Sequence, residues 1–246
     1  MCAPLESALQ CAIFLDLDGT LIDIAPTPDD VTIPKGLAEL LIRLEQRLGG
    51  ALAVLTGRPI ADVDRFLAPL VPVAAGVHGA ELRSVPRGNV VHRAAPIDPD
   101  IVRSVRRVAD GTADVLVETK RASIAVHYRQ APALAAALEA ALARILEEGP
   151  DHMILARGRQ VLEIVPRHIS KGAALEVIMA LPAFAGRHPV MIGDDSPDVS
   201  AFEAATRLGG KGLKVAGEQF SRAEAHFAGP AEVRAWLESM IEGLAP

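Results

Sequence analysis

A short apolar stretch near the N-terminus, AIFLDLDGTLID at residues 12–23, constrains the fold of this chain more than any other feature. Residues 12–15 are long enough for one buried strand of a parallel sheet, and Asp16 and Asp18 follow directly. Side chains two residues apart on a strand point the same way, so both carboxylates are expected to project from its carboxyl end. In open α/β sheets, ligands bind at that end.

Two like charges this close together are costly unless a cation or a shared proton relieves the repulsion. The motif alone leaves two interpretations open, a simple turn and a catalytic site. A calcium loop is a weaker third alternative, because an EF-hand loop has its glycine at the sixth position, whereas Gly19 is fourth counted from Asp16. The choice depends on what the other strand ends of the chain carry.

Composition limits the partners of this chain. Aromatic residues make up only 3% of the 246 residues, which argues against a stacking surface for single-stranded nucleic acid. The net charge of −6 argues against nucleic acid or an anionic membrane as a partner. No window approaches about 18 uninterrupted apolar residues, so no membrane span is expected. This net charge is also common among soluble cytosolic enzymes.

The cysteines and the N-terminus indicate a cellular compartment. Cys2 and Cys11 lie too close to the start of the chain to form a disulfide framework, which indicates a reducing environment. The first ten residues lack a charged segment followed by an apolar one, so no signal peptide is expected. We therefore expect a cytoplasmic protein.

The first part of the chain alternates apolar runs with helical spacing, which indicates right-handed βαβ units and a parallel sheet. The expected order is strand 12–15, helix 35–48, strand 51–55, helix 60–67, strand 73–75 and a hairpin of 81–85 with 89–92. The same βα pattern resumes with helix 171–181, for which Ser170 is a plausible N-cap, and continues with strands 189–192 and 213–215 and helix 231–241.

Between these two parts the pattern changes to helix, strand, strand, helix, strand, strand, which is typical of an α+β module. The expected elements are helices 101–108 and 133–146 and strands 115–119, 123–128, 152–155 and 161–165. We therefore predict an α/β fold in which a Rossmann-like core, residues 1–97 and 167–246, carries an inserted α+β cap domain, residues 98–166.

The predicted strand ends carry a set of groups that suits phosphoryl transfer. A carboxylate can attack phosphorus without a base, and a second one can protonate the leaving alkoxide and then deprotonate water. Acidic residues with a backbone carbonyl form an oxygen site that favours Mg²⁺. A hydroxyl and an ammonium group can stabilise the phosphoryl charge. The residues of this set are Asp16, Asp18, Thr56, Lys171, Asp194 and Asp195.

In type and order these residues resemble the motifs of the haloacid dehalogenase superfamily of phosphatases. The four matching motifs are Asp16-x-Asp18-Gly19-Thr20, Thr56, Lys171 and Gly193-Asp194-Asp195 with Asp198. The resemblance implies that Asp16 is the nucleophile and Asp18 the general acid and base. It also implies a metal held by Asp16, the Asp18 carbonyl and Asp194, with Asp195 and Asp198 orienting the groups nearby.

Further segments resemble trehalose-6-phosphate phosphatases, which implies trehalose 6-phosphate as the substrate. They are Gly57-Arg58-Pro59, residues 76–81, Glu118-Thr119-Lys120, His127-Tyr128-Arg129, residues 161–166 and Ser170-Lys171-Gly172. The implied substrate-binding residues are Gly57, Arg58, His78, Glu118, Lys120, Arg129 and Glu163. Pro197 and Val199 depart from the family pattern, which has Thr and Glu there.

Other interpretations stay open. The chain is also compatible with a phosphatase of the same fold that acts on sucrose phosphate or a hexose phosphate. A non-catalytic sugar-phosphate sensor, or a regulatory partner of a trehalose-6-phosphate synthase, is a third alternative, although a binder needs no nucleophile. Glu118, Lys120 and Arg129 also suit the solvated face of a sheet, and His78 suits a turn.

Overall fold

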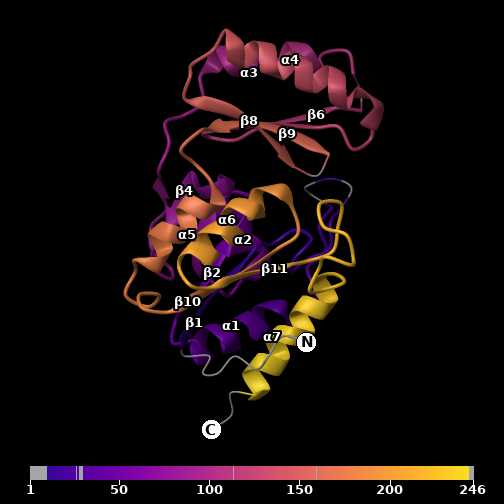
Figure 1. The fold of residues 1–246 in the computed structure, drawn as a ribbon. Helices are drawn as coiled ribbons and strands as arrows, with labels where there is room; N and C mark the ends of the chain where they lie inside the picture. The colour runs from indigo at the N-terminus through magenta and orange to yellow at the C-terminus, as the bar shows by residue number, and fades with distance from the viewer. Residues whose placement is uncertain (1–9, 26, 28–29, 113, 159, 244–246) are drawn as a thin grey trace.

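The computed structural model describes residues 10–25, 27, 30–112, 114–158 and 160–243, and it contains two β-sheets, one above the other in Figure 1. Both termini of the described chain lie at the lower end of this view. Cys2 lies outside the described residues, and Cys11 is a buried free thiol.

The larger sheet has seven strands in the order β11-β10-β1-β2-β3-β4-β5. The strands from β11 to β3 run parallel, and β4 and β5 extend the sheet as an antiparallel hairpin. Their bounds are β11 (Lys211–Lys214), β10 (His188–Gly193), β1 (Cys11–Leu15), β2 (Leu52–Leu55), β3 (Val73–Gly76), β4 (Glu81–Arg83) and β5 (Val91–His92). This sheet confirms the predicted α/β fold.

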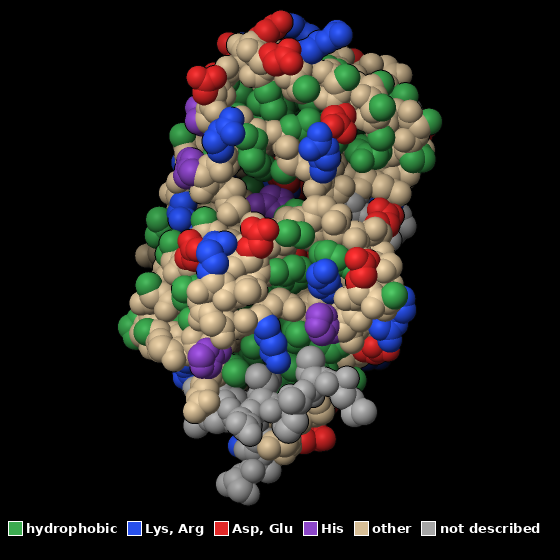
Figure 2. Space-filling view, in the orientation of Figure 1, with side chains coloured by type: hydrophobic (Ala, Val, Ile, Leu, Met, Phe, Trp, Pro, Cys, Tyr) green, Lys and Arg blue, Asp and Glu red, His purple; other side chains and the backbone are tan. Residues whose placement is uncertain are grey.

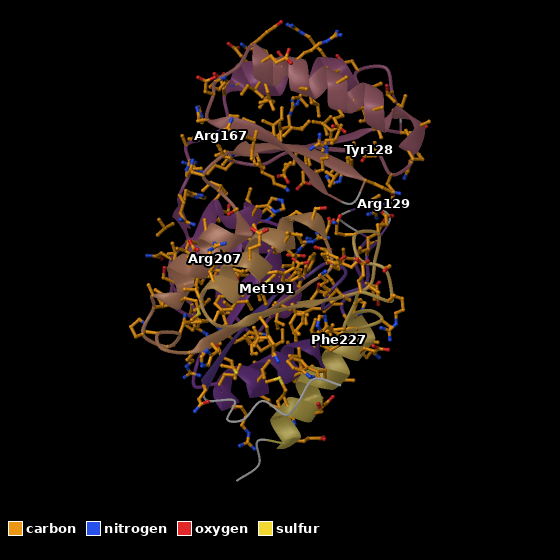
Figure 3. All side chains as sticks on the ribbon, viewed as in Figure 1. Tyr128, Arg129, Arg167, Met191, Arg207 and Phe227 are labelled. Atoms are coloured by element: carbon orange, nitrogen blue, oxygen red, sulfur yellow. The ribbon has the colours of Figure 1, made fainter. Side chains whose placement is uncertain are left out.

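The strand of the opening stretch, β1, lies inside the larger sheet, and all five of its residues are buried. Helices cover both faces of the sheet, which explains why the strand is continuously apolar rather than alternating. Figure 1 shows α1 and α7 together on one face and α5 and α6 on the other, while Met191 of β10 lies between these layers in Figure 3. The bounds are α1 (Leu37–Arg47), α5 (Lys171–Met179), α6 (Ser196–Arg207) and α7 (Pro230–Gly243).

The smaller sheet has four antiparallel strands in the order β6-β7-β9-β8, and two helices pack on it. We call this sheet with α3 and α4 the cap. Its elements are α3 (Pro99–Ala109), β6 (Leu116–Thr119), β7 (Ile124–His127), η3 (Pro132–Leu134), α4 (Ala135–Glu147), β8 (Met153–Gly158) and β9 (Val161–Pro166). The α+β order is as predicted, whereas the cap's standing as a separate domain stays a prediction.

Sequence reasoning missed one helix, α6, which directly follows the fourth motif. Its start was present in the sequence, because Asp195 is the N-cap, Pro197 lies in the first turn and Asp198 completes a capping box. This helix matters for the site, because its first turn holds Asp195 and Asp198 next to the carboxyl end of β10. Helix α2 (Ile60–Leu67), which also belongs to the core, lies at the residues predicted for it.

On the face of the molecule that Figure 2 shows, acidic and basic side chains are interspersed. Among the residues that the structure describes, no helix has the length and apolarity needed to cross a bilayer. The cytoplasmic location and the exclusion of nucleic acid stay predictions.

Candidate active site

Parallel strand register brings three of the four predicted motifs to one place. Leu15 pairs with Ile192 of β10 on one side and with Val54 of β2 on the other. The Asp16 N–H then donates to the Ile192 carbonyl at 2.9 Å, which keeps the chain aligned one residue beyond the strand. Asp16, Thr56 and Asp194 therefore leave neighbouring strands at the same edge of the sheet.

Lys171 joins this group from the first residue of α5. Its Nζ lies 2.6 Å from Asp16 Oδ1 and 2.6 Å from Asp198 Oδ1, and all three side chains are buried. Burial alone would lower the pKa of Lys171, but the two carboxylates raise it overall, so the lysine stays charged. A cation at a helix start opposes the helix dipole, and the buried carboxylates explain why it is there.

Asp194 completes a cluster with more negative than positive charge. Oxygens of Asp16, Asp194 and Asp198 all lie within 4.8 Å of one another. Burial, and then the neighbouring Asp198 carboxylate, raise the pKa of Asp194 to about 7. Burial likewise raises the pKa of the Asp16 carboxyl. Three carboxylates thus share one lysine, and an all-oxygen set of this kind fits a hard divalent cation, which would relieve their repulsion.

A glycine makes room for Asp194. Gly19 has a φ of +78°, in the left-handed region, and a Cβ built on it would lie 2.1 Å from Asp194 Oδ2. Thr20 next to it holds the same carboxylate, with its hydroxyl 3.3 Å from Oδ1. The Gly-Thr pair of the first motif is thus needed to seat the aspartate of the fourth.

The remaining aspartates of the fourth motif orient the cluster and cap α6. Asp198 Oδ2 accepts hydrogen bonds from the backbone N–H groups of Asp194 and Asp195, at 3.0 and 3.1 Å. The Asp195 side chain accepts from the Ser196 N–H at 2.7 Å. Pro197 occupies the first turn, where proline is tolerated, and Val199 packs against the core. The two departures from the family pattern therefore fit this helix.

Thr56 lies in a loop that several hydrogen bonds hold in place. It is buried, and its hydroxyl oxygen accepts from the Arg58 N–H at 3.1 Å, which leaves its own proton available to a ligand. The adjoining turn η2 (Val77–Gly79) bonds back to this loop through the Val77 and His78 N–H groups. Both residues have left-handed backbones, with φ of 48° and 54°, an uncommon conformation for a non-glycine residue and unusual for valine.

His78 lies in this turn, and its side chain contacts the cap. Its imidazole packs over Gly57, where a Cβ would lie 2.7 Å from the ring. His78 Nε2 lies 2.7 Å from Glu163 Oε2, and Glu163 also accepts from Lys120 at 3.1 Å and from Ser123 at 2.6 Å. Burial alone would raise the pKa of Glu163, but Lys120 and His78 lower it well below its usual range.

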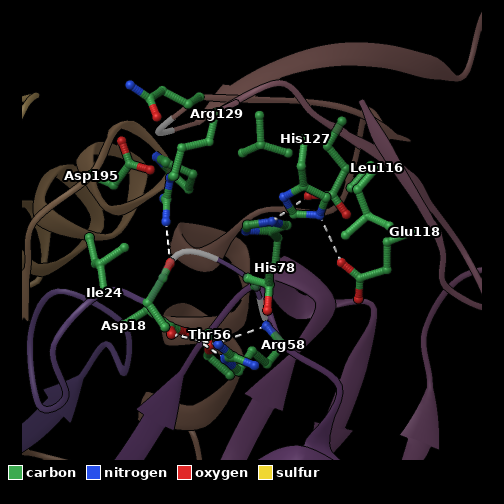
Figure 4. Close-up of a pocket in the computed structure, with 18 of the residues that line it drawn as sticks. Asp18, Ile24, Thr56, Arg58, His78, Leu116, Glu118, His127, Arg129 and Asp195 are labelled. Atoms are coloured by element: carbon green, nitrogen blue, oxygen red, sulfur yellow. Dashed lines mark hydrogen bonds and ion pairs between the residues drawn. The ribbon is translucent and has the colours of Figure 1, made fainter. Parts of the chain in front are cut away.

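Side-chain hydrogen bonds join the cap to the core at the cavity. Besides the His78–Glu163 pair, Lys120 Nζ donates to the Gly57 carbonyl at 3.0 Å, and Arg129 donates to the Ala25 carbonyl. Arg129 lies on the side of the cap that faces the core (Figures 3 and 4). The cap is closed over the strand ends in this structure.

A cavity of about 430 Å³ lies between cap and core. Glu118 lines it and lies 3.0 Å from His127 Nε2, a bond drawn in Figure 4. Although burial opposes the shift, His127 and Lys120 lower the pKa of Glu118, so it stays ionised. The cavity is lined by all the predicted catalytic, metal-binding and substrate-binding residues: Asp16, Asp18, Thr56, Gly57, Arg58, His78, Glu118, Lys120, Arg129, Glu163, Lys171 and Asp194.

The structure adds two residues that the sequence-based list of candidate site residues did not contain. His127 contacts Glu118, and Ser123 contacts Glu163. A signal for His127 was present, because it belongs to the segment His127-Tyr128-Arg129 that resembles the family. Ser123 carries no such signal, since its role depends on where β9 pairs with β7. Of the predicted residues, Asp198 lies behind the cavity, where it orients its neighbours.

Comparison with known proteins agrees with this arrangement. The sequence model of the trehalose-phosphatase family matches residues 14–231, which contain every residue of the site. The chain belongs to the trehalose-phosphatase family.

Two relatives and one solved structure show how similar this chain is to known proteins. A trehalose-6-phosphate phosphatase of Escherichia coli K12 is 38% identical over 97% of this chain and 90% of its own. A probable trehalose-phosphate phosphatase of Sinorhizobium fredii is 42% identical over 83% of this chain and 77% of its own. The C-terminal domain of a Candida albicans trehalose-6-phosphate phosphatase has the same fold, with a TM-score of 0.80 at 17% identity over 95% of this chain and 92% of its own.

Proposed function

We propose that this protein is a Mg²⁺-dependent phosphatase that converts trehalose 6-phosphate to trehalose and phosphate through an aspartyl-phosphate on Asp16. One observation carries the proposal. Asp16, Thr56, Lys171 and Asp194 meet beneath a cavity of about 430 Å³, a volume in the range of small-molecule sites. The names of the bacterial relatives support the substrate.

In the first step, an Asp16 carboxylate oxygen attacks phosphorus and the bond from phosphorus to the sugar oxygen breaks. Lys171 holds Asp16 at 2.6 Å, which fixes the direction of the attacking carboxylate. The Thr56 hydroxyl donates to a phosphoryl oxygen, and the Lys171 charge stabilises the transition state. A Mg²⁺ ion held by Asp16, the Asp18 carbonyl and Asp194 would supply further charge stabilisation on the phosphoryl oxygens.

Asp18 moves the proton in both steps. It gives its proton to the departing sugar oxygen and then takes one from the water that attacks the aspartyl-phosphate, which releases phosphate and restores Asp16. Asp18 lines the cavity and its side chain is about one-third exposed, at 31%, so it can reach both the sugar oxygen and water.

The sugar would lie on the cap side of the cavity. Ionised Glu118 and Glu163 can accept hydrogen bonds from sugar hydroxyls, while Lys120 and Arg129 can donate to ring and glycosidic oxygens. Gly57 and His78 would contribute from the core. Because Lys120, Glu163 and His78 are bonded to one another across the closed cavity, substrate entry requires the cap, residues 98–166, to open.

Two alternatives differ from this proposal in substrate or in class. A phosphatase for sucrose phosphate or a hexose phosphate would show a higher kcat/KM on that substrate in a panel of sugar phosphates. A sensor would bind trehalose 6-phosphate without releasing phosphate, but the complete nucleophilic set argues against it. A functional link to a trehalose-6-phosphate synthase and a cytoplasmic location complete the proposal.

The role of Glu118 in reading the sugar has a direct test. Because a hydrogen bond to a charged group contributes about 1.5–3 kcal/mol, Glu118→Ala is expected to raise KM for trehalose 6-phosphate about ten-fold or more. KM for p-nitrophenyl phosphate, which has no sugar, should change less than about two-fold. Steady-state kinetics on both substrates measure the difference.

Glu139→Ala is the matched control, since Glu139 is a cap glutamate that pairs with Arg157 and does not line the cavity. It should leave both KM values unchanged. Equal effects of Glu118→Ala on the two substrates would contradict a role in sugar recognition.

A further inference from the structure

Arg58 makes its principal contact with Asp18, the proposed general acid and base, rather than with the open part of the cavity. Its Nε lies 2.7 Å from Asp18 Oδ2 and its Nη2 lies 2.8 Å from Asp18 Oδ1, two parallel bonds that Figure 4 shows. Such a bidentate pair fixes both the position and the plane of a carboxylate. Resemblance alone assigns Arg58 to the substrate, so this contact suggests a different role.

The guanidinium is itself held on its other sides. Asp62 Oδ2 lies 4.0 Å from Arg58 Nη1, and the Phe66 ring lies beneath the guanidinium, 5.0 Å from its carbon. Both residues come from α2, so the arginine is braced by a helix of the core. The side chain is only 13% exposed. Little of it is left for a sugar to contact.

The backbone of Arg58 is fixed as well. Its N–H donates to the Thr56 hydroxyl at 3.1 Å and its carbonyl accepts from Val77 at 2.9 Å. Lys120 of the cap donates to the carbonyl of the preceding residue, Gly57. Closing the cap therefore adds a contact to the same loop that presents the arginine.

The bidentate pair leaves Asp18 able to react. A carboxylate has about four acceptor positions, and the arginine uses one on each oxygen. The positions that remain include those on the cavity side, where the side chain is exposed. Without the arginine, the carboxylate would rotate among several orientations, and few of them would point at the leaving oxygen.

We infer that Arg58 is a positioning residue, which acts on the reaction by orienting the Asp18 carboxylate and contributes little to sugar binding. This inference rests on the proposed function for the role of Asp18. It predicts that loss of Arg58 lowers kcat on every phosphate monoester, whatever the leaving group, and does not raise KM.

The test compares Arg58→Met on trehalose 6-phosphate and on p-nitrophenyl phosphate. We expect kcat to fall about 30-fold or more on both substrates. KM for trehalose 6-phosphate should change less than about three-fold, whereas KM for p-nitrophenyl phosphate should fall along with kcat, because only the second step is slowed on that substrate. On the aryl phosphate, a burst of p-nitrophenol equal to the enzyme concentration should precede the slow phase. The burst is expected because nitrophenolate leaves without a proton, whereas water attack still needs Asp18.

Arg65→Met is the matched control. Arg65 lies over the same Phe66 ring, at 4.7 Å, and pairs with the same Asp62, at 2.9 Å, but its contacts do not include Asp18. This variant should keep wild-type kcat. Arg58→Lys, which keeps the charge without the two parallel bonds, should recover less than half of the lost kcat and serves if the methionine variant fails to fold.

A double variant separates positioning from an independent contribution. In an Asp18→Asn background, Arg58→Met should cost no further kcat, because the residue through which it acts is already lost. Independent, multiplicative losses would overturn the inference. So would a rise of KM for trehalose 6-phosphate with unchanged constants on the aryl phosphate, which would place Arg58 on the sugar.

The same series of measurements tests the proposed function and the role of Arg58 separately. Wild-type turnover of trehalose 6-phosphate tests the proposed function, whereas the p-nitrophenyl phosphate data test the role of Arg58 without any sugar. A wild-type enzyme that is inactive on trehalose 6-phosphate but shows the expected Arg58 effects on the aryl phosphate would refute only the substrate assignment.

Discussion

Replacing Asp16 by asparagine is expected to lower kcat by about four orders of magnitude or more while the protein stays folded. Asparagine keeps the shape of the side chain and can still accept the Lys171 hydrogen bond, but an amide oxygen does not form the phosphoryl intermediate. The change also removes one negative charge from a crowded buried cluster. Phosphate release measures turnover, and thermal unfolding measures the folded state.

Asp110→Asn is the matched control, because it makes the same chemical change on an exposed residue at the end of α3. It should retain full turnover. If Asp16→Asn released phosphate at more than about one hundredth of the wild-type rate, a different nucleophile would have to be sought. That threshold lies far above the residual activity expected when a nucleophile is removed.

Lys171→Met is expected to destabilise the metal-free protein by about 3–5 kcal/mol and to abolish turnover. The reason is that Asp16 and Asp198 both bond to this ammonium group and are buried, so its loss leaves uncompensated charge in the interior. The free energy of unfolding from urea titration measures the loss. Added Mg²⁺ should recover part of the stability but none of the activity, since a bound cation offsets the repulsion without replacing the lysine.

Arg207→Met provides the comparison. Arg207, labelled in Figure 3, pairs with Glu176 at 2.8 Å, with more than half of its side chain exposed. An exposed pair contributes at most about 1 kcal/mol. A loss of that size for Lys171→Met as well, or no response of the variant to Mg²⁺, would show that the lysine does not balance the acidic cluster.

The positions of Asp16, Thr56 and Asp194 were predictable because parallel strands deliver their carboxyl ends to one edge, and short apolar runs mark those strands. Ser170 was predictable as an N-cap for a similar local reason, and its side chain does accept from the Ala173 N–H. The same kind of signal marked α6 through Asp195 and Asp198, but the interpretation of those residues as metal-site groups left the helix unassigned.

Contacts between segments that are distant in the sequence could not be predicted from local sequence patterns. The Arg58–Asp18 pair joins loops 40 residues apart, and the Glu163–His78 pair joins residues 85 apart, one in β9 of the cap and one in the turn η2 of the core. Such pairs depend on how β2 lies beside β1 and how the cap lies on the core. The left-handed turn at Val77 and His78 was equally hidden, because valine disfavours that conformation in isolation.

The central claim is tested most directly by phosphate release from trehalose 6-phosphate, with Mg²⁺ and with excess chelator, alongside glucose 6-phosphate. We expect saturable release with Mg²⁺, loss of nearly all activity with chelator, and a kcat/KM on glucose 6-phosphate lower by about two orders of magnitude or more, because the monosaccharide makes fewer contacts with the cap. No release from trehalose 6-phosphate with Mg²⁺ present, or an equal kcat/KM on the two sugars, would contradict the account.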